Sequence, residues 1–263
     1  MARAASVSHG GGGGGNALTP IGFQARSVGI VSAPSIRVAV GTHEELYVRH
    51  PYLQSLPTAA DVSTILVFDL RMPISSLAAH LLNLTRIRAL QEPVTVVVSP
   101  SGEHAMGELT IIEVPEGSTL VVKPRSLVGV IKPIHSGSRI TREWKLKEWM
   151  AWLTLKLRFV VVHGPIKVVL KGHRGIRMEP VDGGRAISRS AVIAFSANLE
   201  VQPVRAEPFW PYLNGSQGLF NDRYSGNAGQ IIFEENVGLE GHQNVVSRNL
   251  GRIYDTVLTI FGV

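Results

Sequence analysis

The chain has no cysteine and few aromatic residues. None of its 263 residues is Cys, and 6% are Phe, Trp or Tyr. The lack of Cys excludes a disulfide scaffold, thiolate zinc sites, iron–sulfur clusters and thiol catalysis. The sequence also lacks the roughly 20 uninterrupted apolar residues of a membrane-spanning helix. It has no apolar core of a signal peptide, so we expect a protein that is not secreted.

Sequence motifs of catalysis are also missing. The nine His residues are scattered, and no two have the spacing of an HExxH or HxH metal site. There is no GxSxG elbow, and the glycine run Gly10–Gly15 is not followed by the Lys-Ser/Thr of a phosphate-binding loop. We therefore expect a protein that is not an enzyme, with no metal, no cofactor and no small-molecule substrate.

Positive charge is concentrated in the middle of the chain. Residues 121–189 contain 15 Lys or Arg against 4 Asp or Glu, whereas the whole chain has a net charge of +6. Such a field attracts anionic lipid headgroups, nucleic acid or an acidic protein surface, or it is simply a solvated face. Arg outnumbers Lys by 19 to 7, and Arg favours bidentate contacts.

Composition divides the chain into three parts. Residues 1–22 form a flexible tail rich in glycine, and residues 23–246 form a β body. Residues 247–263 are apolar at intervals, too short to span a membrane, and are expected to dock on a partner or on lipid.

The body has the pattern of an all-β protein. Runs rich in β-branched residues, each of strand length, are separated by turn residues every 8–12 positions. The runs are 36–40, 64–68, 94–98, 109–114, 120–122, 127–131, 166–170, 191–195 and 230–233.

Two segments have helical spacing instead. The first is Ser75–Gln91, which follows Pro73 and precedes Pro93. The second is Ser138–Ala151, where Leu146, Trp149, Met150 and Leu153 fall within one arc of roughly 100°. A period of two follows, so a strand is expected to begin near Trp152.

A short motif recurs along the chain. Glu116-Gly117 precedes a strand, an Arg-Ser pair and a second strand, and Asp182-Gly183 precedes the same series. A weaker copy follows Glu240-Gly241. The pattern indicates duplication of a β unit of roughly 60 residues, unless these short motifs agree by chance.

Several glycine-containing segments resemble a known family. They are 164–172 with 175–176, the Asp182-Gly183 turn, the strand entry 189–192, 215–220, 224–226 and 229–231. Together they resemble the altered inheritance of mitochondria protein 24 family, of the tryptophan-RNA-binding-attenuation-protein-like superfamily. The resemblance implies three tandem β-sandwich repeats around a pseudo-threefold axis, to which this chain adds one or two short helices. It implies no catalytic residues, and eukaryotic members are linked to organisation of the mitochondrial inner membrane.

The candidate contact residues lie in the basic region. Trp beside Lys and Leu on a short segment is typical of a membrane interface, of a single-strand nucleic-acid site, or of packing in the core. The expected membrane or partner anchor is Trp144, Leu146, Trp149, Met150 and Trp152. The expected basic contact face is Arg142, Lys145, Lys147, Lys156, Arg158, Lys167, Lys171 and Arg174.

The sequence thus favours a structural subunit at a membrane surface. We expect an accessory or assembly subunit of a larger, energy-transducing membrane complex, peripheral to the cytoplasmic or matrix-like side. Its partners would be subunits of that complex and anionic lipid, with nucleic acid less favoured. The alternative is a soluble oligomeric module that binds RNA or a small ligand.

Overall fold

The computed structural model describes residues 21–22, 29–67, 82–100, 107–144, 158–188, 190–205, 220–226 and 229–236. In these ranges the regular structure is β-strand, apart from two single 3-10 turns, η1 (His50–Tyr52) and η3 (Pro124–Ser126). The described strands form four sheets, called A to D. Neighbouring strands are antiparallel except β1 and β9, which pair in parallel.

Sheets A and B are the two large sheets, and each contains seven strands. In spatial order, sheet A is β1 (Ile21–Gly22), β9 (Glu108–Val114), β14 (Ile166–Gly172), β11 (Leu127–Pro133), β4 (Glu44–Arg49), β7 (Leu82–Ala89) and β6 (Ala60–Val67). Sheet B is β12 (Arg139–Trp144), β13 (Arg158–His163), β10 (Thr119–Val122), β17 (Val192–Ser196), β20 (Gly229–Asn236), β15 (Arg174–Val181) and β2 (Gly29–Ile30).

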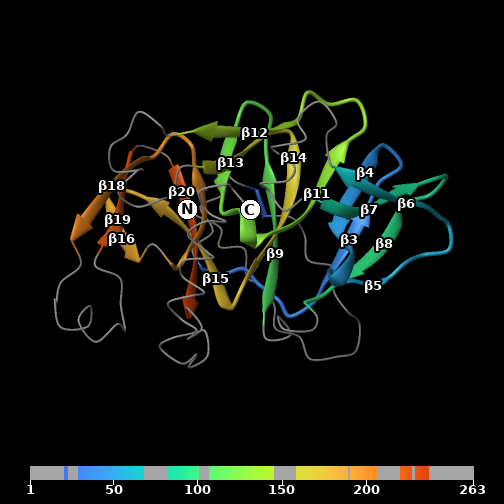
Figure 1. Cartoon of the computed structure of the whole chain (residues 1–263), viewed down its shortest axis with the longest axis horizontal. Coiled ribbons are helices and arrows are strands. Elements are labelled where there is room, and N and C mark those ends of the chain that lie inside the picture. Colours follow the sequence, from blue (N-terminus) through green and yellow to red (C-terminus); the bar gives the residue numbers. More distant parts are fainter. Residues whose placement is uncertain are drawn as a thin grey trace, which may run out of the picture.

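The two small sheets lie at opposite ends of the molecule. Sheet C is β3 (Ile36–Val40), β8 (Val94–Val98) and β5 (Leu53–Ser55). Sheet D is β16 (Arg185–Ser188), β19 (Phe220–Ser225) and β18 (Glu200–Arg205). Figure 1 shows sheet C on the right, beside β4, β6 and β7 of sheet A, and sheet D on the left.

Three hydrophobic clusters fill the spaces between the sheets. One joins C to A, the largest joins A to B, and the third joins B to D. Strand β14 shows how: Ile166, Val168 and Leu170 enter the A–B cluster, whereas Val169 enters the C–A cluster. Successive side chains of a strand point to opposite faces, so a strand in a sheet that is covered on both sides needs apolar residues at successive positions.

The order in which strands join sheets follows one pattern three times within the described residues. Each repeat of the pattern is a set of six consecutive strands. The first, third and sixth strands of a set lie in one sheet, and the second, fifth and fourth lie side by side, in that order, in the next sheet. Unit 1 (β3–β8) uses sheets C and A, unit 2 (β9–β14) uses A and B, and unit 3 (β15–β20) uses B and D. Sheets A and B are therefore each shared by two units.

Between the second and third strands of each unit, the chain turns a corner from one sheet to the other. Corner 1 is Arg49–Leu53 and corner 2 is Lys123–Leu127; each has a basic residue, a Pro-containing 3-10 turn and a closing Leu. The φ and ψ values match closely, −64° and 126° at Arg49 against −69° and 123° at Lys123. Corner 3 runs from Ser188 to Val192, where the Ala191 N–H donates to the Ser188 carbonyl over 3.0 Å.

The expected strands are largely found, and the two expected helices are wrong where the structure describes them. Leu82–Ala89, within the expected helix 75–91, is strand β7; Arg139–Trp144, within 138–151, is strand β12. In β7, Leu84 enters the A–B cluster and Ile87 the C–A cluster, so apolar residues three apart serve two faces of a strand. Residues 75–81 and 145–151 lie outside the described residues.

Some residues of the expected tail and of the repeated motif lie within the described residues, and others lie outside them. Ile21–Gly22, at the end of the expected tail 1–22, forms β1 beside β9. Gly117 and Gly183 of the two stronger motif copies both have positive φ, 76° and 80°, which suits a glycine turn. The weaker copy at 240–250 and the segment 247–263 lie outside the described residues. The domain boundaries remain a prediction.

The Gly164 position is closed to a side chain. A Cβ there would lie 2.0 Å from the Pro115 carbonyl oxygen, which is backbone and cannot turn away. We expect Gly164→Ala to lower the free energy of unfolding by about 1–3 kcal/mol, measured by urea denaturation. Gly137→Ala is the matched control, because nothing lies within 4 Å of its Cβ position. Equal stability of the two variants would show that Gly164 does not limit packing at this turn.

Candidate functional site

The expected anchor belongs to the hairpin formed by β12 and β13. Strand β12 is at the edge of sheet B and pairs with β13 from Arg139–His163 to Trp144–Arg158. The other anchor residues, Leu146, Trp149, Met150 and Trp152, lie in 145–157, which joins the two strands outside the described residues. We call residues 145–157 the Trp/Lys segment; the strands at its two ends belong to the same sheet edge.

Trp144 is the expected anchor residue that lies in a described strand, as the last residue of β12. Ile140 pairs with Val162 and Arg142 with Val160, and Ile140, Val160 and Val162 belong to the A–B cluster. The roles of Trp144 and of the other four anchor residues stay predictions.

The expected basic contact face is spread over several parts of the molecule. Arg142, Arg158 and Arg174 lie on β12, β13 and β15, while Lys145, Lys147 and Lys156 lie outside the described residues. Lys167 on β14 is ion-paired with Glu44, with 2.6 Å between Nζ and Oε1. Its charge is thus offset within the protein. Lys171, at the end of the same strand, has different surroundings.

Lys171 lies beside corner 1 and close to corner 2. Its Nζ donates to the Tyr52 hydroxyl over 2.8 Å and lies 5.5 Å from the centre of that ring. Arg49 also hydrogen-bonds Tyr52, and Arg49 and Arg125 both act electrostatically on Lys171. We call Arg49, Tyr52, Arg125 and Lys171 the corner cluster. Of these four, only Lys171 was expected from the sequence, because the other members come from two separate turns.

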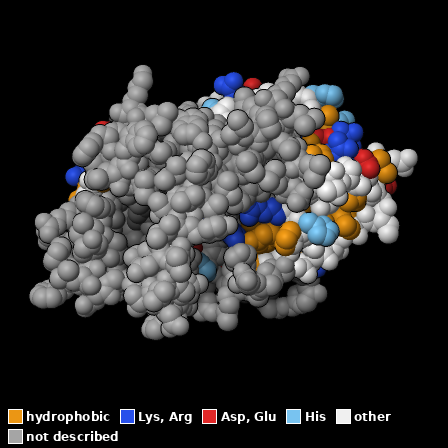
Figure 2. Space-filling model, in the orientation of Figure 1, with side chains coloured by type: hydrophobic (Ala, Val, Ile, Leu, Met, Phe, Trp, Pro, Cys, Tyr) orange, Lys and Arg blue, Asp and Glu red, His pale blue; other side chains and the backbone are white. Residues whose placement is uncertain are grey.

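The corner cluster holds positive charge in a partly buried place. Burial, and then the charges of Arg49 and Arg125, lower the pKa of Lys171 to about 8. Burial also raises the pKa of Tyr52, so its phenol keeps its proton at neutral pH. Tyr52 itself is 4% exposed, whereas Arg125 is on the surface. Figure 2 shows that cationic and hydrophobic side chains lie side by side near the middle of this view.

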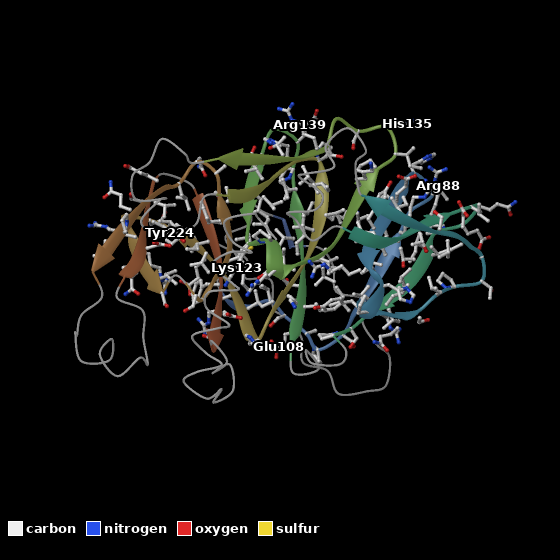
Figure 3. All side chains as sticks on the ribbon, in the orientation of Figure 1. Arg88, Glu108, Lys123, His135, Arg139 and Tyr224 are labelled. Carbon is white, nitrogen blue, oxygen red and sulfur yellow. The ribbon has the colours of Figure 1, made fainter. Side chains whose placement is uncertain are left out.

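Corners 2 and 3 meet. Lys123, at the start of corner 2, donates from Nζ to the Ser190 carbonyl oxygen over 3.1 Å. Its backbone N–H donates to the Ile193 carbonyl, just beyond corner 3. Figure 3 shows Lys123 near the middle of the molecule, between Tyr224 at one end and Arg88 at the other. Corners 1 and 2 are thus linked through Lys171, whereas corners 2 and 3 contact each other directly.

Several other charged groups in the described part of the chain are linked in networks of both signs. Glu45 accepts hydrogen bonds from Arg88 and from the Tyr47 hydroxyl, and Glu179 is ion-paired with Arg177 and Arg185. Hydrogen bonds from Arg88 and Tyr47 hold the pKa of Glu45 below its usual value although burial raises it. These networks connect neighbouring strands, so we assign them a structural role.

The described residues offer neither a metal centre nor a membrane-spanning helix. Among them, no three His, Asp or Glu side chains are grouped so that they could hold a metal ion. Within the same ranges, no helix has both the length and the apolar composition to cross a bilayer.

Similarity to known proteins lies in the fold. The crystal structure of protein SPYM3_0169 from Streptococcus pyogenes matches with a TM-score of 0.53, over 87% of this chain and 99% of that one. The two sequences are 11% identical, so the match shows a shared all-β fold and nothing finer. No protein-family model matches the chain, and neither does any curated protein.

The pKa of Lys171 predicts a pH dependence of stability. Below about pH 8 Lys171 is protonated in the native protein, where burial makes its charge unfavourable. In the unfolded chain Lys171 keeps its proton up to its ordinary pKa of 10.5. Stability therefore rises with pH between these values, by at most about 1.4 kcal/mol per unit and less because the amine is partly exposed.

Lys171→Met removes this titration. From about pH 7 to about pH 9.5 we expect wild type to gain about 1 kcal/mol of unfolding free energy relative to this variant, measured by urea denaturation. Lys167→Met, on the same strand, is the control and should keep a constant difference from wild type. A constant difference for Lys171→Met as well would mean that Lys171 carries its charge without cost.

Proposed function

We propose that the protein is a non-enzymatic structural subunit that associates peripherally with a membrane and stabilises or assembles a larger, energy-transducing membrane complex. The proposal includes membership of the altered inheritance of mitochondria protein 24 family and a pseudo-threefold arrangement of units 1 to 3. The fold of SPYM3_0169 and the recurring strand order are consistent with both.

The observation that carries the proposal is the tethering of the Trp/Lys segment. Residues 145–157 are held at both ends by one hairpin, whose last pair is Trp144 with Arg158. Trp149 and Trp152 stand among Lys145, Lys147 and Lys156, a composition that suits the interface of an anionic membrane. In general, a segment joined to a folded body at both ends loses less entropy on binding than one with a free end.

The position of this segment in the strand order adds support. It joins strands 4 and 5 of unit 2, and the same step is made by 68–81 in unit 1 and 206–219 in unit 3. Phe68 and Met72 stand in the connection of unit 1, Phe209 and Trp210 in that of unit 3. Each unit thus carries apolar and aromatic residues in the equivalent connection, as expected of a surface that meets a partner at several points.

The first test is native purification from the protein's own membranes in mild detergent, with mass spectrometry of the subunits that migrate with it. We expect stoichiometric migration with one membrane complex, whose identity would name the process served. A protein recovered alone in the soluble fraction, or with bound RNA, would instead support the soluble binding module.

A second test addresses the anchor directly. We expect Trp149→Ala with Trp152→Ala to reduce binding to anionic vesicles at least about tenfold, because two interfacial rings are lost. Lys145→Glu with Lys147→Glu should also weaken binding, and wild-type binding should fall with added salt. Co-sedimentation with vesicles measures both effects.

The control replaces exposed apolar residues elsewhere. Leu56 and Val62 are 44% and 40% exposed, so Leu56→Ala with Val62→Ala should leave vesicle binding unchanged. Circular dichroism checks that each variant keeps its β structure. If the double Trp variant unfolds, the two rings are part of the core and the anchor is wrong.

A further inference from the structure

The three units place different residues at the position of Lys171. Strand 6 of each unit pairs with the residue that closes the corner: Val98 with Leu53, Leu170 with Leu127, and Phe233 with Val192. The next residue is Ser99 in unit 1, Lys171 in unit 2 and Glu234 in unit 3. The fold therefore does not require a lysine at this point.

The two junctions between units differ in charge. At the junction of units 2 and 3, Lys123 takes the corner position of Arg49, and the buried Glu234 takes the position of Lys171. Glu234 there accepts a hydrogen bond from the His173 N–H over 2.8 Å. At the junction of units 1 and 2 the corresponding residues are the cations Arg49 and Lys171, and Arg125 is a third cation there. One junction combines both signs, and the other concentrates one sign.

Within the part of the chain that the structure describes, no carboxylate is among the groups that act on Lys171. The described titratable or charged groups that face it are Arg49 on β4, Tyr52 on η1 and Arg125 on η3. The nearest acidic residue along the neighbouring strand β9 is Glu108, opposite Gly172. By strand alternation it lies on the other face, where it accepts hydrogen bonds from Ser32 and from the Gly175 N–H.

We propose that the corner cluster is a binding site for the phosphate group of a phosphomonoester. The inference goes beyond the proposed function, because it requires neither a membrane nor a complex. Two guanidinium groups and an ammonium provide several charged donors within one small region, and guanidinium matches phosphate oxygens in bidentate geometry. Tyr52 accepts from Lys171 and Arg49, so its own O–H remains available as a donor to the anion.

The charge of the cluster favours a dianion over a carboxylate. A phosphomonoester carries close to two negative charges at neutral pH and offers three acceptor oxygens, whereas a carboxylate offers one charge and two oxygens. The surface position of Arg125 gives the phosphate an approach from solvent. Such a group can come from a free metabolite or from a lipid headgroup.

Glycerol 3-phosphate is the soluble probe. We expect about 10 mM of it to raise the Tm of the full-length protein by about 3 °C relative to sodium chloride of equal ionic strength, as for a Kd of about 1 mM. Calorimetric titration should give an affinity that is at least about tenfold weaker for Lys171→Met. Tyr52→Phe should also weaken binding, since it removes one donor.

Lys132→Met is the matched control, because it removes a cation from the neighbouring strand β11, where Lys132 lies 5.1 Å from the centre of the Tyr47 ring, and it should bind as wild type does. Raising the pH from about 7.5 to about 9.5 should weaken wild-type binding several-fold, although the phosphate remains a dianion throughout. Equal binding by wild type and both Met variants, or no rise in Tm beyond the chloride reference, would overturn the site.

Vesicles distinguish the two sources of phosphate. Vesicles of phosphatidylcholine with phosphatidic acid present a phosphomonoester, and vesicles with an equal charge of phosphatidylglycerol present only diesters. Preferential binding to phosphatidic acid that is lost in Lys171→Met assigns the site to a lipid headgroup. Binding of glycerol 3-phosphate without that preference assigns it to a soluble ligand. If only the variant with Trp149→Ala and Trp152→Ala loses vesicle binding, the result supports the anchor of the proposed function and does not contradict the phosphate site.

Discussion

Burial of sheets A and B on both faces is the constraint on which the structure depends. Each is covered by another sheet on either side, so the alternation of apolar and polar residues typical of a half-exposed strand is lost there. Charged residues in these strands must find partners or reach an edge. Lys167 does so with Glu44, Arg88 with Glu45, and Lys171 at the end of β14 with Tyr52.

The corners solve a second problem, which is to carry the chain between layers without leaving backbone groups unpaired. A 3-10 turn shifts the direction of the chain, and the corner then closes with a backbone hydrogen bond, as from Leu53 to His50 and from Leu127 to Pro124. Basic residues stand at the start of corners 1 and 2. The same corners that build the layers thus bring cations from distant parts of the sequence together, which no single strand could do.

Much of the strand content could be predicted from the sequence, and little of the arrangement. Runs such as 36–40 and 94–98 are visible because β-branched residues dominate them. Leu82–Ala89 resembles a helix because its apolar residues serve two different cores. Corner 1 escapes sequence analysis because His50-Pro51-Tyr52 does not resemble the Arg-Ser pair of the other corners. Its likeness to corner 2 lies in a basic residue, a proline and a closing Leu, a signal that is visible once the geometry is known.

The sharing of sheets makes unit 2 indispensable to both of its neighbours. Pairing of β11 with β4 joins it to unit 1 within sheet A, and pairing of β10 with β17 joins it to unit 3 within sheet B. Neither outer unit contains a complete large sheet, since three of the seven strands of each large sheet come from unit 2. The molecule is therefore a stack of four layers, and each of the two inner layers is a continuous sheet that spans two units. Sheets C and D can loosen by themselves, whereas separation of the units would require hydrogen bonds to break along an entire strand.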